Sequence, residues 1–252
     1  MAPFQFDVKP HNAHYDTSYS SKMIQWRQFG AKEKSGNIAH ILTNNAKSKS
    51  GDIRDENVSQ GKILEVGCGT GIVLQELKNI GIGREFHGID VIDLDRNRDV
   101  GEDIRLLQYD GDAIPFEDRN FDFTYATHVI EHIDNPRALI KEMSRVTKGL
   151  MYFEVPCELH ARTTYNDLQK TLNIGHINAY TPESFSLLLQ TCGLEVIGLE
   201  IFDHTLEVHS FYCGRMRGMA KMAIRRGALA LNPYLASRIF SYHCGALVRR
   251  SS

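Results

Sequence analysis

The first segment able to do chemistry follows a short apolar run and reads EVGCGTG over residues 65–71. Three glycines in five residues let a backbone turn approach a ligand closely, because no side chain stands in the way. The spacing misses the G-x-G-x-x-G dinucleotide fingerprint, since Ile72 occupies its sixth position, and no Gly-Lys-Ser/Thr completes a phosphate-binding loop. The Glu65 carboxylate would repel a pyrophosphate but suits a cation. The turn is therefore predicted to bind a cationic ligand.

A second carboxylate, Asp90, ends the segment EFHGID, 19 residues beyond Gly71. In nucleotide-binding α/β sheets an acid at the end of the second strand accepts hydrogen bonds from both ribose hydroxyls. Asp93 and Asp95 follow closely and could take this role instead. A third acidic segment, DGDAIPF, occupies residues 110–116.

The elements that must position these residues alternate between strands and helices. A polar, helical lead-in covers residues 1–60, and short apolar segments then alternate with amphipathic ones. The amphipathic segments have helix signals: capping residues with Pro136 or Pro182 at the start, and a glycine at the end. This pattern predicts an α/β domain over 61–252, with a mostly parallel sheet, helices on both faces and a basic helical insertion at about 203–240. Strands are expected at 62–67, 85–90, 104–110, 121–129, 149–156, 195–202 and 242–250, and helices at 70–81, 134–149 and 181–193.

Four segments in this order and spacing carry a family resemblance: ILEVGCGTG, GID, DGDAIPFEDRNFD and ATHVIEHIDNP. They resemble the class I S-adenosylmethionine-dependent methyltransferases, in the branch that acts on small molecules, lipids and sugars. The resemblance covers roughly residues 60–200, and YHCGALVRR is similar to the family's closing strand. It implies a Rossmann-like seven-stranded sheet in the order 3-2-1-4-5-7-6, with the last strand antiparallel, and S-adenosylmethionine as cofactor.

The resemblance also implies roles for individual residues in holding that cofactor. The glycines would line its methionine and ribose portion, Glu65 would lie near its ammonium group, and Asp90 would hold the ribose hydroxyls. Around the adenine, Asp112 would accept from the amino group, the Ala113 backbone would meet the ring and Ile114 would pack on it. The cofactor-binding residues implied are Glu65, Gly67, Gly69, Gly71, Asp90, Asp112, Ala113 and Ile114.

Two histidines are candidate catalytic residues. His128, near the end of the fourth expected strand, could act as a general base toward a hydroxyl, because imidazole titrates near neutral pH. His176, on a loop beyond the fifth strand, is the second candidate. Each could instead line the pocket or hydrogen-bond within its loop, and Glu154 could serve either substrate contact or structure. There is no H-E-x-x-H motif, and His128 and His132 straddle a strand-to-helix junction, so no metal is expected.

Composition restricts the class of protein and its compartment. The chain of 252 residues has a net charge of −2, and its five cysteines are scattered without a C-x-x-C pair, which argues against a disulfide framework. No apolar run approaches the roughly 18 residues of a membrane-spanning helix, and the N-terminus lacks the pattern of a secretory signal. We therefore expect a cytoplasmic protein.

Charge is distributed unevenly along the chain. Residues 214–252 hold eight Lys and Arg and no Asp or Glu. Arg217, Lys221 and Arg225 follow at intervals of four and are expected to share one helical face. That face could be a solvated cover over the pocket, could dock segment 215–226 on the inner face of a membrane, or could engage an anionic acceptor. Nucleic acid ranks last, because no aromatic residues interleave with the basic ones.

The sequence favours O-methylation of a small-molecule, sugar or lipid-linked hydroxyl. Two alternatives remain: an RNA or protein methyltransferase that docks through the basic segment, and a non-catalytic module that keeps the cofactor fold. The chain has no [DN]-P-P-[YF] motif of the N6-adenine type, which disfavours DNA base methylation.

Overall fold

The computed structural model describes residues 21–46, 58–94 and 99–251. These residues form a seven-stranded sheet in the order β3-β2-β1-β4-β5-β7-β6. Strand β7 runs antiparallel to both of its neighbours, and the pairs among β1 to β5 are parallel. The sheet order and the antiparallel last strand predicted above are therefore confirmed. The strands are β1 (Lys62–Val66), β2 (Glu85–Asp90), β3 (Ile104–Gln108), β4 (Phe121–Thr127), β5 (Thr147–Cys157), β6 (Leu194–Phe202) and β7 (Tyr242–Arg250).

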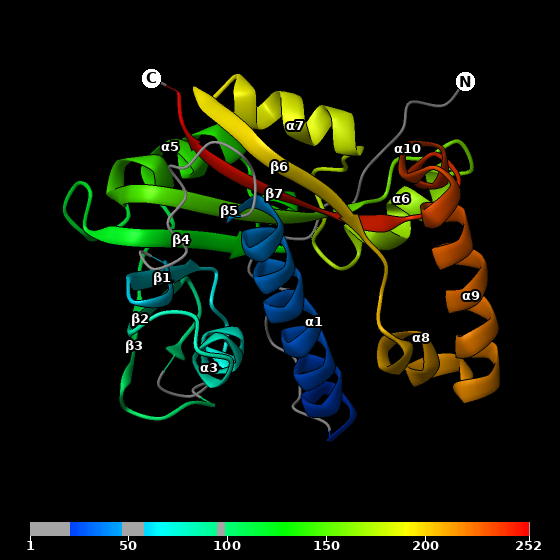
Figure 1. Cartoon of the computed structure of the whole chain (residues 1–252), viewed down its shortest axis with the longest axis horizontal. Coiled ribbons are helices and arrows are strands. Elements are labelled where there is room, and N and C mark those ends of the chain that lie inside the picture. The colour runs from blue at the N-terminus through cyan, green and yellow to red at the C-terminus, as the bar shows by residue number, and fades with distance from the viewer. Residues whose placement is uncertain (1–20, 47–57, 95–98, 252) are drawn as a thin grey trace.

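Helices cover both faces of this sheet (Figure 1). Helices α5 and α7 lie on one face, α1 and α3 on the other, and α8 to α10 connect β6 to β7 at one end. The described helices are α1 (Ser21–Ala46), α3 (Ile72–Asn79), the 3-10 turn η2 (Ile130–His132), α5 (Pro136–Val146), α6 (Tyr165–Leu172), α7 (Pro182–Gln190), α8 (Leu206–Cys213), α9 (Arg215–Leu231) and α10 (Pro233–Ser237).

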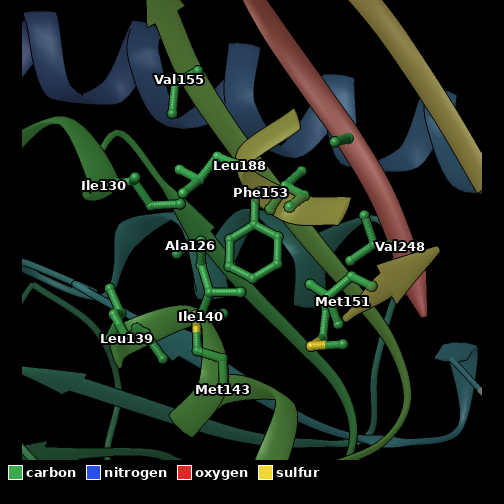
Figure 2. Packing of buried hydrophobic residues seen from close by; sticks show 14 of the residues in the cluster. Ala126, Ile130, Leu139, Ile140, Met143, Met151, Phe153, Val155, Leu188 and Val248 are labelled. Carbon is green, nitrogen blue, oxygen red and sulfur yellow. The ribbon is translucent and has the colours of Figure 1, made fainter. Parts of the chain in front are cut away.

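Alternate residues along the strands pack into two apolar layers, one on each face of the sheet. On β1, Leu64 packs toward α5 and α7, whereas Ile63 packs toward α1 and α3. Figure 2 shows the first layer, a cluster that contains Phe153 of β5, Leu139 and Met143 of α5, and Leu188 of α7. Strands buried on both faces in this way position their carboxyl ends rigidly, and ligands of open α/β sheets bind at those ends.

The caps predicted for α5 and α7 are present. The Asn135 side chain accepts a hydrogen bond from the Ala138 N–H at 3.2 Å, with Pro136 as the first helical residue. The predicted end of α5 at Gly149 is wrong, because the helix stops at Val146 and Thr147 already begins β5. Gly149 instead serves strand pairing, since a Cβ there would lie 2.7 Å from the backbone oxygen of Asp122.

The lead-in helix is a single element. Neither Gly30 nor Gly36 interrupts α1, and Ile38 and Ile41 are fully buried against the sheet. The predicted lead-in otherwise falls on residues 1–20 and 47–57, outside the described residues.

The predicted basic face of the late insertion is wrong in one residue. Arg217 and Lys221 are exposed on α9, but Arg225 is only 7% exposed. Its Nε donates to Asp203 Oδ1 at 2.6 Å, and its guanidinium lies 4.3 Å from the centre of the Tyr242 ring. Residues at i, i+4 and i+8 drift around a helix of 3.6 residues per turn, so the third of them turns inward.

Candidate active site

One large cavity opens at the carboxyl ends of the parallel strands. It measures about 2250 Å³ and is lined by the segments that follow β1, β2, β3 and β4, together with α1. Pockets for a single small ligand usually measure about 300–1,000 Å³. The cavity is therefore large enough to hold a cofactor and an acceptor at once.

The glycine turn after β1 forms one wall of this cavity. Gly67 and Gly69 have φ of +74° and +53°, the left-handed region that glycine favours. A Cβ at Gly67 would collide with the Val129 side chain at 2.3 Å, whereas one at Gly69 would meet nothing within 4 Å. Gly69 thus presents bare backbone to the cavity, and its N–H donates to Asp90 Oδ2 at 2.6 Å.

Glu65 lies beneath the turn and is only 2% exposed. Its Oε2 has no hydrogen-bond partner among the described residues. Burial, reinforced by the nearby Asp90, raises the pKa of Glu65 to about 8, although Lys34 opposes the shift. Such a carboxylate gains from a cationic group placed beside it. The site therefore fits a ligand with an ammonium group and no phosphate, as S-adenosylmethionine is.

The other residues implied for the cofactor divide into two groups. Asp90 and Asp112 line the cavity with Glu65, Gly67 and Gly69. Gly71, Ala113 and Ile114 are not part of the cavity lining. The Ile114 side chain is 1% exposed and packs in the apolar core.

His128 follows β4 in an unusual backbone conformation. Its φ of +59° is rare for a residue other than glycine, and such geometry is held only by its surroundings. Its Nε2 lies 3.3 Å from Glu154 Oε1 and its Nδ1 lies 3.6 Å from Glu131 Oε1. Burial, together with the nearby Lys34 and His243, lowers the pKa of His128 well below its usual value. The imidazole is thus neutral and able to accept a proton.

Glu154 of β5 contacts the Nε2 side of the His128 ring. It is fully buried and accepts hydrogen bonds from Asn37 Nδ2 at 3.1 Å and from the Tyr152 hydroxyl. Burial alone would raise the pKa of Glu154, but His128 and His243 hold it well below its usual value. Of the two roles left open for Glu154, these contacts favour the structural one, with an ionised carboxylate orienting His128.

The second candidate, His176, lies on the same cavity wall. Its Nδ1 is 2.9 Å from Glu158 Oε1. Burial would lower the pKa of His176, but the hydrogen bond with Glu158 outweighs it and raises the pKa. The raised pKa makes neutral His176 the stronger base of the two, whereas His128 is neutral over a wider pH range.

Comparison with known proteins identifies the family. Residues 27–199, more than two thirds of the chain, match a family described as a methyltransferase domain. The chain belongs to this family. The resemblance to a methyltransferase family noted in the sequence is therefore confirmed, and solved structures with the same fold contain S-adenosylhomocysteine or S-adenosyl-L-methionine.

Relatives at the sequence level match only part of the chain. The methyltransferase is 31% identical over 105 residues to demethylmenaquinone methyltransferase of Staphylococcus aureus, covering 38% of this chain and 43% of that one. It is 27% identical over 93 residues to sterol 4-C-methyltransferase of Caenorhabditis elegans, covering 34% and 27%. The chain thus matches less than half the length of these relatives.

Solved structures share the fold across nearly the whole chain. Phosphoethanolamine N-methyltransferase 2 of Haemonchus contortus with S-adenosyl-L-methionine matches 99% of this chain and 62% of that one, with TM-score 0.60 and 12% identity. Geranyl diphosphate methyltransferase with the same cofactor matches 95% and 94%, with TM-score 0.58 and 12% identity.

Several cavity residues of the methyltransferase carry no motif in the sequence. Lys34 of α1 donates to the Thr127 carbonyl at 3.5 Å, and Glu33 lies 2.7 Å from His204 Nδ1. Asn37 of the same helix and His243 of β7 complete the surroundings of Glu154. Only long-range packing of α1 and β7 brings these residues to the strand ends, so local patterns could not reveal them.

Proposed function

We propose that the enzyme methylates a hydroxyl group of a small or lipid-linked acceptor, with His128 as the proton acceptor. The observation that carries this proposal is the neutral His128 beside the ionised, buried Glu154 in the wall of the cofactor cavity. Oxygen acceptors gain most from such a pair, because a hydroxyl must lose its proton as the new bond forms.

The cofactor site rests on five of the sequence-derived residues. Glu65 would pair with the cofactor ammonium, the bare backbone of Gly67 and Gly69 would lie along it, and Asp90 would accept from the ribose hydroxyls. Asp112 is exposed on the cavity wall, where it would meet the adenine amino group. When bound, S-adenosylmethionine supplies a methyl group made electrophilic by its sulfonium.

The protein residues must then remove the proton of the acceptor hydroxyl. The hydrogen bond to Glu154 favours the tautomer of His128 with its proton on Nε2, which leaves Nδ1 to take the proton of the acceptor hydroxyl. The charge that develops on the imidazole is stabilised by the Glu154 carboxylate, itself held by Asn37 and Tyr152. Glu154 is in this sense a positioning residue.

Two observations support a lipid-linked acceptor. The relatives named above act, by their names, on menaquinone precursors and sterols. In addition, the outer face of α9 alternates apolar and basic side chains: Met216, Ile224 and Leu231 are 81%, 64% and 90% exposed, beside Arg217 and Lys221. A helix with such a face binds at the surface of an anionic membrane. Among the described residues, no helix is long and apolar enough to span one.

The test begins with transfer of labelled methyl from the cofactor into separated pools of small molecules, polysaccharide, lipid and RNA. We expect label in the lipid or small-molecule pool, as a methyl ether that hydroiodic acid cleaves. Label in RNA, or a methyl group on nitrogen or carbon, would overturn the proposal.

With the acceptor in hand, His128→Asn tests the base. Asn tolerates the left-handed backbone at this position. We expect kcat to fall by about 10²–10³-fold while cofactor affinity changes less than about twofold. The exposed His40→Asn on α1 is the matched control, and equal kcat values for both variants would refute the role of His128.

A further inference from the structure

Glu131 of η2 is a buried carboxylate that the proposed reaction does not use. It is fully buried, and neither side-chain oxygen has a hydrogen-bond partner among the described residues. His128 Nδ1 lies 3.6 Å from Oε1 of Glu131, which is too far for a good hydrogen bond. A carboxylate taken out of water and given no donor is costly, so a cation at this position would stabilise the fold.

Two imidazoles face this carboxylate in the arrangement typical of metal ligands. His132 Nδ1 lies 2.9 Å from the Gly175 carbonyl, and His176 Nδ1 lies 2.9 Å from Glu158 Oε1. A histidine that ligates a metal nearly always donates its other ring N–H to a carbonyl or carboxylate in this way. These partners assign Nε2 of each ring as the ligating atom.

We propose that Glu131, His132 and His176 bind a divalent transition-metal ion, such as Zn²⁺ or Mn²⁺, at the wall of the cofactor cavity. Their candidate ligand atoms all lie within 4.8 Å of one another. An ion with bonds of about 2.0–2.2 Å draws such atoms slightly closer together. Two imidazoles and one carboxylate suit these ions, whereas Mg²⁺ and Ca²⁺ prefer all-oxygen sites.

The loop that carries His176 is tied to η2 before any ion binds. The N–H groups of Ile177 and Asn178 donate to the Glu131 backbone carbonyl at 2.9 and 3.0 Å. The Asn178 side chain donates to the Ile133 carbonyl at 2.7 Å. Ligands separated by some 45 residues in sequence are thus held together by the backbone, and binding need not order a loop.

A neighbouring cluster serves as an internal comparison. Glu33, His204 and His243 also lie within the same ligand spacing, but Glu33 there accepts directly from His204 and from the Thr205 N–H, both at 2.7 Å. Its charge is already balanced. The sequence has no H-E-x-x-H motif and so predicts no metal, because residue spacing carries no signal for a third ligand on a distant loop.

The experiment uses the full chain, stripped of metal with a chelator and titrated with Co²⁺ and then Zn²⁺ at pH 7.5. Visible absorption of Co²⁺ and calorimetry with Zn²⁺ should each show one ion per chain. Glu131→Gln and His176→Ala should weaken that binding at least about 30-fold, and His204→Ala, from the neighbouring cluster, should leave it unchanged. Retained cofactor affinity shows that each variant is folded.

X-ray absorption of the unaltered protein with one Zn²⁺ bound gives an independent count of ligands. Two imidazoles with oxygen ligands are expected. The proposal is overturned if no stoichiometric ion binds, if His204→Ala rather than His176→Ala abolishes binding, or if the ion has three or more imidazoles. None of these readouts requires an acceptor, so they remain decisive even if O-methylation is wrong.

Discussion

At the scale of single residues, the cofactor site depends on a carboxylate whose ionisation is unfavourable in the free protein. Burial raises the pKa of Glu65 from its usual 4.5 to about 8. The folded state therefore holds this proton more tightly than the unfolded state does. Protonation stabilises the fold fully below pH 4.5, and this stability is lost as pH rises through 8.

Glu65→Gln should consequently stabilise the cofactor-free protein at high pH. Between pH 6 and 8 the wild type should lose about 1.4 kcal/mol of unfolding free energy per pH unit relative to the variant. Saturating S-adenosylmethionine should narrow this gap, because its ammonium favours the ionised carboxylate. Denaturant unfolding at pH 6, 7 and 8 measures the effect, with the exposed Glu117→Gln as control. Parallel pH profiles for wild type and Glu65→Gln would contradict the assignment.

The turn itself can be tested with two glycines in the same conformation. Gly69 and Gly81 both have positive φ, and a Cβ at either would meet nothing within 4 Å. Each change to Ala should cost about 1–2 kcal/mol of stability from backbone strain alone. Only Gly69→Ala should weaken cofactor binding, by at least about tenfold, because only its Cβ enters the cavity.

Calorimetric titration with S-adenosylmethionine compares the two variants directly. If Gly69→Ala and Gly81→Ala bind the cofactor equally well, the glycine turn does not approach it.

At the scale of secondary-structure elements, the sequence predicted the strands and the starts of helices, because neighbouring residues determine them. Alternating apolar segments indicated the seven strands, and Pro136 and Pro182 marked where two helices begin. The order of strands came from the family resemblance. Helix ends were less predictable: Gly149 looked like a helix terminator, yet the close approach of β4 requires a glycine there.

The phase of α9 could not be predicted either, because the buried face of a helix depends on its neighbours. Arg225 packs between Asp203 and Tyr242 rather than on the basic surface. Similarly, His176 lies near Glu131 because its loop crosses back to η2 through backbone hydrogen bonds. Residue spacing along the chain contains no signal for such contacts.

Arg225 should therefore matter for stability. Arg225→Met leaves the buried Asp203 carboxylate with His209 Nε2, at 3.1 Å, as its remaining side-chain partner, and should cost about 3–5 kcal/mol. Arg226→Met, on the exposed side of the same helix, should change stability by less than about 0.5 kcal/mol. Urea unfolding measures both, and equal losses would show that the Arg225 ion pair does not anchor α9.

At the scale of the whole molecule, the acidic cofactor cavity and the basic surface of α9 lie in different places. The cofactor cavity has acidic residues at its strand ends, whereas residues 214–252 carry eight basic residues and no acidic ones. Figure 1 shows α8 and α9 extending away from the sheet at one end of the molecule. Donor binding and surface docking are therefore expected to respond to different mutations.

Reversing the exposed charges of α9 tests the proposed docking surface. In the variant Arg217→Glu/Lys221→Glu the local charge falls by four, so binding to vesicles of anionic lipid should drop at least about tenfold, since each basic residue near such a surface contributes about 1 kcal/mol. Raising salt should also weaken the binding of the wild-type protein to these vesicles, because screening acts over about 8–10 Å.

The control variant Arg84→Glu/Lys141→Glu changes the charge equally at two other exposed positions and should retain most of the vesicle binding. Cofactor affinity should be unchanged in both variants. Equal vesicle binding by the two double variants would mean that net charge alone attracts the protein, and that α9 is a solvated cover.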